Sequence, residues 1–204
     1  LDTPRAIDMA GRLRMLSQRC TKAYLQWGQS IAGDSARTLL QESVSRYEAH
    51  LAALKTFMPN PAVQASLPQL QTLWSQFKAL LIGEPSRTGA AALYDANETL
   101  QSAAHYLTVS YGNTNGSPLE YLIGLAGRQR MLSQRLAKNY FLSAAKVDSK
   151  VVQAQLASDA ADFRQALQTL KAAPVSTSSI RNELELADSQ WLFFESALRR
   201  PADD

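Results

Sequence analysis

The chain reads AGRLRMLSQR at residues 10–19 and AGRQRMLSQR at residues 126–135, and only Leu13 and Gln129 differ between the two stretches. The two copies are 116 residues apart, and the same offset, or 117 after one extra loop residue, relates residues far outside the motif. Identical pairs at these offsets are Lys22 and Lys138, Tyr24 and Tyr140, Leu51 and Leu167, Trp74 and Trp191, and Phe77 and Phe194. Because core positions recur together with the motif, the chain is an internal duplication of one module.

The spacing of apolar residues predicts helices along almost the whole chain, and no alternating strand pattern is convincing. Gly, Pro and Asn divide the chain into about seven helices, expected near residues 3–32, 34–58, 67–82, 86–111, 118–146, 149–173 and 179–200. Asp34 or Ser35 is the expected N-cap of the second helix, and the PNP stretch at 59–61 is the expected loop before the third. The run GNTNGSP at 112–118 is the strongest turn signal in the chain.

The fold class that follows is all-α, with two tandem up-down helical bundles. Residues 1–112 are expected to form a first module of four helices, and residues 117–204 a second module of three. Short connections make successive helices antiparallel. The two helices that carry the repeated motif are therefore expected to run parallel to each other about a pseudo-two-fold axis.

The composition excludes several classes of protein. A net charge of +3 over 204 residues, without a run of Lys or Arg, does not suit a nucleic-acid binder. No apolar run approaches the roughly 20 residues that span a bilayer. Cys20 is the single cysteine, so no intrachain disulfide is possible, and it is expected to be packed in a core. The chain begins at Leu1, and we expect either a soluble protein or one from which a signal peptide or membrane anchor has been removed.

The first motif helix carries two different stripes of residues. One is an ordinary core stripe of Met9, Leu13, Leu16, Cys20 and Tyr24. The other is unusual because small residues surround one arginine, with Ser and Gln one turn further on. In the first copy the candidate ligand contacts of this stripe are Gly11, Arg14, Ser17 and Gln18. In the second copy they are Gly127, Arg130, Ser133 and Gln134.

Arg14 and Arg130 are the candidate ligand-binding residues. In the expected parallel pair they face each other with like charge in a seam of small residues, where an unpaired charge is costly. A bound oxyanion would compensate both charges, since two guanidinium groups offer forked donors and the Ser and Gln side chains could complete its hydrogen bonds. The alternative is structural pairing of each arginine with a carboxylate.

The other polar residues suggest no chemistry. The remaining motif arginines lie on nearly the opposite side of the helix, where we expect them to be solvated or paired with acidic residues of neighbouring helices: Arg12, Arg19, Arg128 and Arg135. His50 and His105 lack a metal-ligand partner one turn away and are interpreted as ordinary helix residues. No catalytic, metal or cofactor motif is present, so we expect a protein that is not an enzyme and needs no cofactor.

The repeated string resembles the P-box of PilJ-type sensory domains, the extracytoplasmic N-terminal modules of type IV pilus methyl-accepting chemotaxis transducers, and it is similar to the input domain of NarX-type nitrate/nitrite sensor kinases. This resemblance covers nearly the whole chain. It implies a four-helix bundle that dimerises through its first helix and, as in the nitrate-sensing members, an anion on the dimer axis held by the arginine before Met. That residue is Arg14 in one copy and Arg130 in the other. A typical member has one module per chain, whereas this chain has two in tandem.

The leading hypothesis is therefore an extracytoplasmic, periplasmic sensory protein that binds nitrate or nitrite between Arg14 and Arg130. Its partners would be the oxyanion and a membrane receptor or sensor kinase, with no nucleic acid and a possible homodimer. The alternative is a non-enzymatic interaction protein whose P-box helices dock a membrane receptor or a pilus-associated partner. It predicts that the isolated chain shows exposed apolar surface and self-associates.

Overall fold

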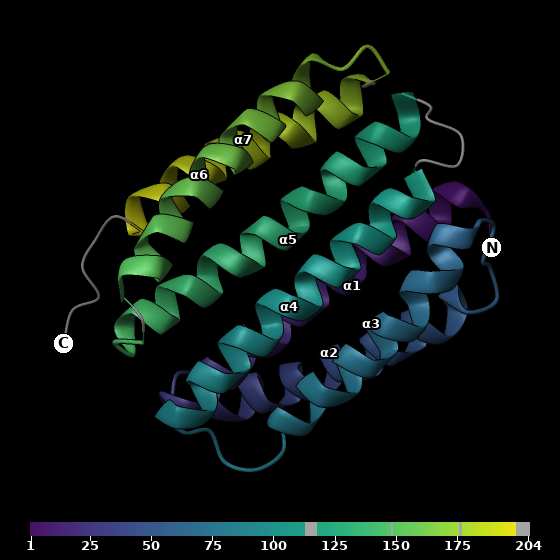
Figure 1. Cartoon of the computed structure of the whole chain (residues 1–204). Helices are drawn as coiled ribbons and strands as arrows, with labels where there is room; N and C mark the ends of the chain where they lie inside the picture. The colour runs from purple at the N-terminus through teal and green to yellow at the C-terminus, as the bar shows by residue number, and fades with distance from the viewer. Residues whose placement is uncertain (113–117, 148, 176, 199–204) are drawn as a thin grey trace.

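The computed structural model describes residues 1–112, 118–147, 149–175 and 177–198 (Figure 1). Within these ranges the chain is all-helical and has no strand. The seven helices are α1 (Thr3–Gly28), α2 (Gly33–Leu54), α3 (Pro61–Leu80), α4 (Arg87–Gly112), α5 (Pro118–Ala144), α6 (Ser149–Ala172) and α7 (Ser178–Leu198). No described helix combines the length and the apolar character that a bilayer span requires.

The helices pack as bundles around a central pair. Helix α1 contacts α2 and α4, and α3 packs on α4, so the N-terminal half (α1–α4) is a four-helix bundle. Helix α5 packs along α1, α6 packs on α5, and α7 packs on α6, which forms the C-terminal half (α5–α7). Figure 1 shows α5, α4 and α1 in the middle of the molecule, with α1 partly hidden behind α4, and it shows α2 and α3 on one side and α6 and α7 on the other.

The sequence repeat is visible in the packing of side chains. Tyr47 stacks on Trp74 with ring centroids 3.7 Å apart, and at the equivalent positions Phe163 stacks on Trp191 at 4.3 Å. These stacks belong to two separate apolar clusters, a large one in the N-terminal half and a smaller one centred on α5 and α6. The duplicated residues therefore occupy equivalent places in two cores.

Helices α1 and α5 run parallel and approach closely where the motif begins. A Cβ atom added to Gly11 would lie 3.6 Å from the Cα of Gly127, so the two backbones are nearly in contact. Further along, the side chain of Gln29 donates a hydrogen bond to the carbonyl of Phe141 at 3.1 Å. The first contact joins the N-terminal halves of the two helices, and the second joins their C-terminal ends. The two helices therefore run parallel, as expected from the repeat.

The starts of two helices differ from the sequence prediction. Neither Asp34 nor Ser35 is the N-cap of α2: the cap is Ala32, in the left-handed conformation with φ of 52°, and Asp34 lies in the first turn. Helix α3 begins at Pro61, six residues before the expected start, because the Asn60 side chain accepts the N–H of Val63 at 2.9 Å. Proline is well suited to the first helical position, since its missing N–H has no partner there in any case. The predicted turn at 112–118 falls mostly on residues 113–117, which lie outside the described residues.

The C-terminal half is less well covered than the N-terminal half. Val63 in α3 is fully buried in the core of the N-terminal half, whereas its equivalent in α7, Ile180, is 48% exposed. On the same helix Phe193 is 80% exposed. Among the described helices no counterpart of α4 packs on α7, so part of its apolar surface faces solvent.

Candidate functional site

Arg14 lies in the seam between α1 and α5 and is only 2% exposed. Its Nη1 is 3.0 Å from Nδ1 of His105, and its Nη2 donates a hydrogen bond of 3.3 Å to the carbonyl of Gly124. Its Nε has no partner, and no carboxylate of the described residues forms an ion pair with this guanidinium. Burial, together with the charges of Arg128 and Arg130, lowers the pKa of Arg14 to about 10. The group is still charged at neutral pH, and its charge has no local counterion.

Arg130 occupies the equivalent place on α5 but has a different environment. Its Nη2 donates a hydrogen bond of 2.5 Å to Oδ1 of Asp8, and its side chain is 40% exposed. Asp8 and Gly124 are equivalent positions of the repeat, because both lie six residues before the motif arginine. Each arginine thus reaches back one to two turns to the same point on the opposite helix. Arg130 finds a carboxylate there, and Arg14 finds only a backbone carbonyl.

The two guanidinium groups converge on Gly127. A Cβ added to this glycine would lie 3.3 Å from Nη2 of Arg14 and 3.7 Å from Nη2 of Arg130, so these two atoms are no more than about 7 Å apart, the total of the two distances. Gly11 lies against the same spot, with its added Cβ 3.5 Å from Nη2 of Arg14. The structure therefore brings together the two arginines and the two glycines named from sequence. On α1 all four of the candidate residues are buried, whereas on α5 only Gly127 of the four is buried and the side chain of Arg130 is 40% exposed.

The Ser and Gln side chains expected to donate to the ligand differ in whether they already have hydrogen-bond partners. The hydroxyl groups of Ser17 and Ser133 donate to the carbonyls of Arg14 and Arg130 on their own helices, at 2.9 and 2.8 Å, so these O–H groups already have acceptors. Gln18 is fully buried, and both polar atoms of its side-chain amide lack a partner. In Gln134 the Oε1 atom lacks one. The amide N–H groups of Gln18 are therefore available to an added acceptor, and the Ser hydroxyl protons are not.

His105 is a site residue that sequence reasoning missed. Because a guanidinium only donates hydrogen bonds, Nδ1 of His105 must accept from Arg14, which requires a neutral ring. Burial, with the charges of Arg14, Arg128 and Arg135, lowers the pKa of His105 and favours this neutral form. The spacing of the chain gives no sign of the contact, since His105 comes from α4, which has no equivalent in the second copy.

The remaining motif arginines have acceptors nearby. Arg128 pairs with Asp162 at 2.5 Å, and Arg135 binds Asp159 through two hydrogen bonds of 2.7 and 2.5 Å, as predicted for acidic partners on a neighbouring helix. The other two differ from the prediction in detail: Arg12 pairs with Asp8 on its own helix, and Arg19 donates to the hydroxyl of Ser43. Among the described residues no cluster of potential metal ligands occurs.

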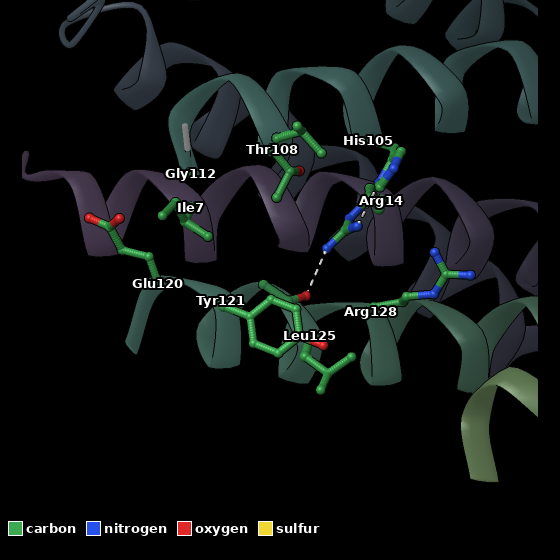
Figure 2. Close-up of a pocket in the computed structure, with 11 residues that line it drawn as sticks. Ile7, Arg14, His105, Thr108, Gly112, Glu120, Tyr121, Leu125 and Arg128 are labelled. Atoms are coloured by element: carbon green, nitrogen blue, oxygen red, sulfur yellow. Dashed lines mark hydrogen bonds between the residues drawn. The ribbon is translucent and has the colours of Figure 1, made fainter. Parts of the chain in front are cut away.

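A chamber of about 380 Å³ adjoins Arg14 between α1, α4 and α5 (Figure 2). Arg14, His105 and Arg128 lie toward one end, and Glu120 lies toward the other. Much of the remaining wall is apolar and comes from all three helices, with Ile7 on α1, Val109 on α4 and Leu125 on α5. Arg14 is thus accessible from a cavity as well as from the seam.

Acid is expected to weaken the fold through His105. Its pKa is about 6.5 in the unfolded chain and lower in the folded one, so between these values the unfolded state binds more protons. The free energy of unfolding should therefore fall as the pH drops below about 6.5. The pKa of His50 is lowered in the same direction, mainly by burial, and it contributes to the same window. Urea unfolding of the wild type, His105→Gln and His50→Gln at several pH values gives the free energy of unfolding as a function of pH. This dependence on pH should be weaker in each variant than in the wild type. An unchanged slope in His105→Gln would contradict the neutral, hydrogen-bonded ring.

Comparison with known proteins identifies the family of this chain. The model of the PilJ family, described as "Type IV pili methyl-accepting chemotaxis transducer N-term", matches residues 3–104 and 121–203. No curated protein and no solved structure matched the chain. Each matched segment contains one copy of the repeated motif, and domains of this family are sensory and usually non-catalytic. The chain therefore belongs to the PilJ family of N-terminal sensory domains of chemotaxis transducers.

Proposed function

We propose that this sensory domain detects a small oxyanion, nitrate or nitrite, held between Arg14 and Arg130. The observation that carries this proposal is the buried guanidinium of Arg14, which is 2% exposed and has no carboxylate partner among the described residues. Burying an ionic group without a counter-charge costs several kcal/mol. An anion that enters the seam supplies the missing charge, and part of that cost becomes binding free energy.

The dimensions of the seam favour a small, flat ion. The Nη2 atoms of Arg14 and Arg130 are no more than about 7 Å apart, and an oxyanion that accepts a hydrogen bond of roughly 2.9 Å from each can bridge them. Guanidinium groups present planar, paired donors that match planar oxyanions. The unpartnered amide of Gln18 is a further donor on the same face of α1.

Asp8 gives the ion a competitor and the domain a means of responding. Its carboxylate holds Arg130 and Arg12 at 2.5 and 2.8 Å, and both hydrogen bonds lower its pKa against the opposing effect of burial. An incoming anion that attracts Arg130 loosens its pairing with Asp8, which is a contact between α1 and α5. A ligand shifts a conformational equilibrium only through such differential contacts, and small helix displacements are a common form of signalling. We place this event in an extracytoplasmic compartment, with a membrane receptor or sensor kinase as the downstream partner.

Isothermal titration calorimetry of the purified chain with nitrate, nitrite, sulfate and chloride tests the proposal. We expect about one nitrate or nitrite per chain. Arg14→Ala and Arg130→Ala should each weaken binding tenfold or more, since a charge-assisted hydrogen bond contributes about 1.5–3 kcal/mol. Arg5→Ala is the matched control, because Arg5 is on the same helix, lies near Asp2 rather than Asp8 and has a side chain 75% exposed. Silence with all four ions, or binding unchanged in Arg14→Ala, would contradict the proposal.

A further inference from the structure

The chamber beside Arg14 is a cavity walled by three helices, and it is distinct from the seam between Arg14 and Arg130. Its volume of about 380 Å³ lies within the range of small-molecule pockets. Helices α1, α4 and α5 all contribute to its wall, whereas Arg130 does not line it. Tyr121 and Val109, both on the wall, are 62% and 42% exposed, so the chamber opens to solvent on their side.

One end of the chamber is arranged for a negative charge. Arg14 faces it as a charged group with an unpartnered Nε, and within the described part of the chain its guanidinium contacts a neutral histidine and a backbone carbonyl. Arg128 lies at the same end in Figure 2 and forms an ion pair with the partly exposed Asp162. A single buried carboxylate there would restore the balance of charge around Arg14.

The rest of the chamber is arranged for an uncharged body. Ile7, Val109 and Leu125 present aliphatic side chains, and Tyr121 adds an aromatic ring. Burial of apolar ligand surface against such walls contributes about 25 cal/mol per Å². The far end holds Glu120, a carboxyl residue that supplies no cationic partner for a second carboxylate of the ligand. This combination is specific for one anionic group on an apolar stem.

We propose that the chamber binds a small organic monocarboxylate, with its carboxylate on Arg14 and its body among the apolar side chains of α1, α4 and α5. The inference rests on the proposed function in one respect, since Arg14 is shared with the oxyanion in the seam. It extends that function from inorganic ions to organic acids. Because one guanidinium cannot satisfy both ligands, the organic acid and nitrate compete.

Hexanoate is a suitable probe, and hexanamide is its uncharged counterpart. We expect hexanoate to raise the thermal midpoint of the whole chain at millimolar concentration and to give a calorimetric isotherm, while hexanamide does neither. Val109→Trp and Leu125→Trp reduce the space in the chamber from two sides and should each weaken hexanoate binding tenfold or more. Tyr106→Trp is the matched control, because Tyr106 is 57% exposed on α4 and does not line the chamber. Circular dichroism establishes that each variant is folded.

The outcomes separate this inference from the oxyanion proposal. Hexanoate binding that survives Arg130→Ala but is lost in Val109→Trp supports the chamber, whether or not nitrate binds. Nitrate binding without hexanoate binding would overturn the chamber alone. Equal binding of hexanoate and hexanamide would overturn the role of Arg14, and hexanoate binding unchanged in both tryptophan variants would place the ligand elsewhere.

Discussion

Gly124→Asp is expected to stabilise the fold and to abolish oxyanion binding. Asp8, the equivalent residue of the first copy, already forms an ion pair with Arg130, and Gly124 is the residue whose carbonyl Arg14 contacts. A Cβ added to Gly124 meets no atom within 4 Å, so the new carboxylate has room. Pairing the buried charge of Arg14, together with the gain in helix propensity, should raise the free energy of unfolding by about 1–3 kcal/mol. The same carboxylate would replace the ion.

Gly124→Ala is the matched control for this variant. It should gain only the difference in helix propensity, roughly 1 kcal/mol, and should bind nitrate as the wild type does. Urea unfolding gives the first quantity and calorimetry the second. A destabilised Gly124→Asp variant, or one that binds nitrate normally, would show that Arg14 does not lack a counter-charge.

Gly127→Leu is expected to produce the largest loss of stability among single substitutions in the seam. Its Cβ alone would lie 3.3 Å from Arg14 Nη2 and 3.6 Å from the Cα of Gly11, which is backbone and cannot rotate away. The additional leucine atoms must therefore separate α1 from α5 or force strained rotamers. Overpacking of this kind costs about 1–3 kcal/mol, and we expect a value near the upper end with loss of nitrate binding.

Two further substitutions test whether the loss of stability in Gly127→Leu comes from the close approach of α1 and α5. Gly127→Ala adds only the Cβ and should cost much less than Gly127→Leu. Gly33→Leu places the same side chain where an added Cβ meets nothing within 4 Å, and it should change the midpoint of urea unfolding little. If Gly127→Leu unfolded at the same urea concentration as Gly33→Leu, the close approach of the two helices would be refuted.

The duplication made the arrangement of α1 and α5 predictable from sequence. Identical motifs at a constant offset require equivalent packing, and alternating helix directions make the two motif helices parallel. The small residues beside Arg14 then indicate a close contact, which the structure places at Gly11 and Gly127. Helix ends were less predictable because capping depends on single residues. Asn60 caps α3 from inside a stretch that its prolines mark as loop.

The unequal environments of the two arginines were not predicted, although the residues responsible are visible in the sequence. A long helical side chain points back toward the N-terminus, so neither guanidinium lies level with its own Cα. The relevant neighbours are therefore Asp8 and Gly124, six residues earlier. The contact with His105 depends on how α4 is rotated about its axis, which no repeat constrains.

The fusion of both halves of the seam into one chain also changes how the site can evolve. In a symmetric homodimer one codon specifies both copies of a position, so a mutation that adds a carboxylate to one arginine adds it to the other. Here positions 8 and 124 are encoded separately, and they hold Asp and Gly. Selection can therefore adjust affinity at one arginine while it preserves a stabilising ion pair at the other.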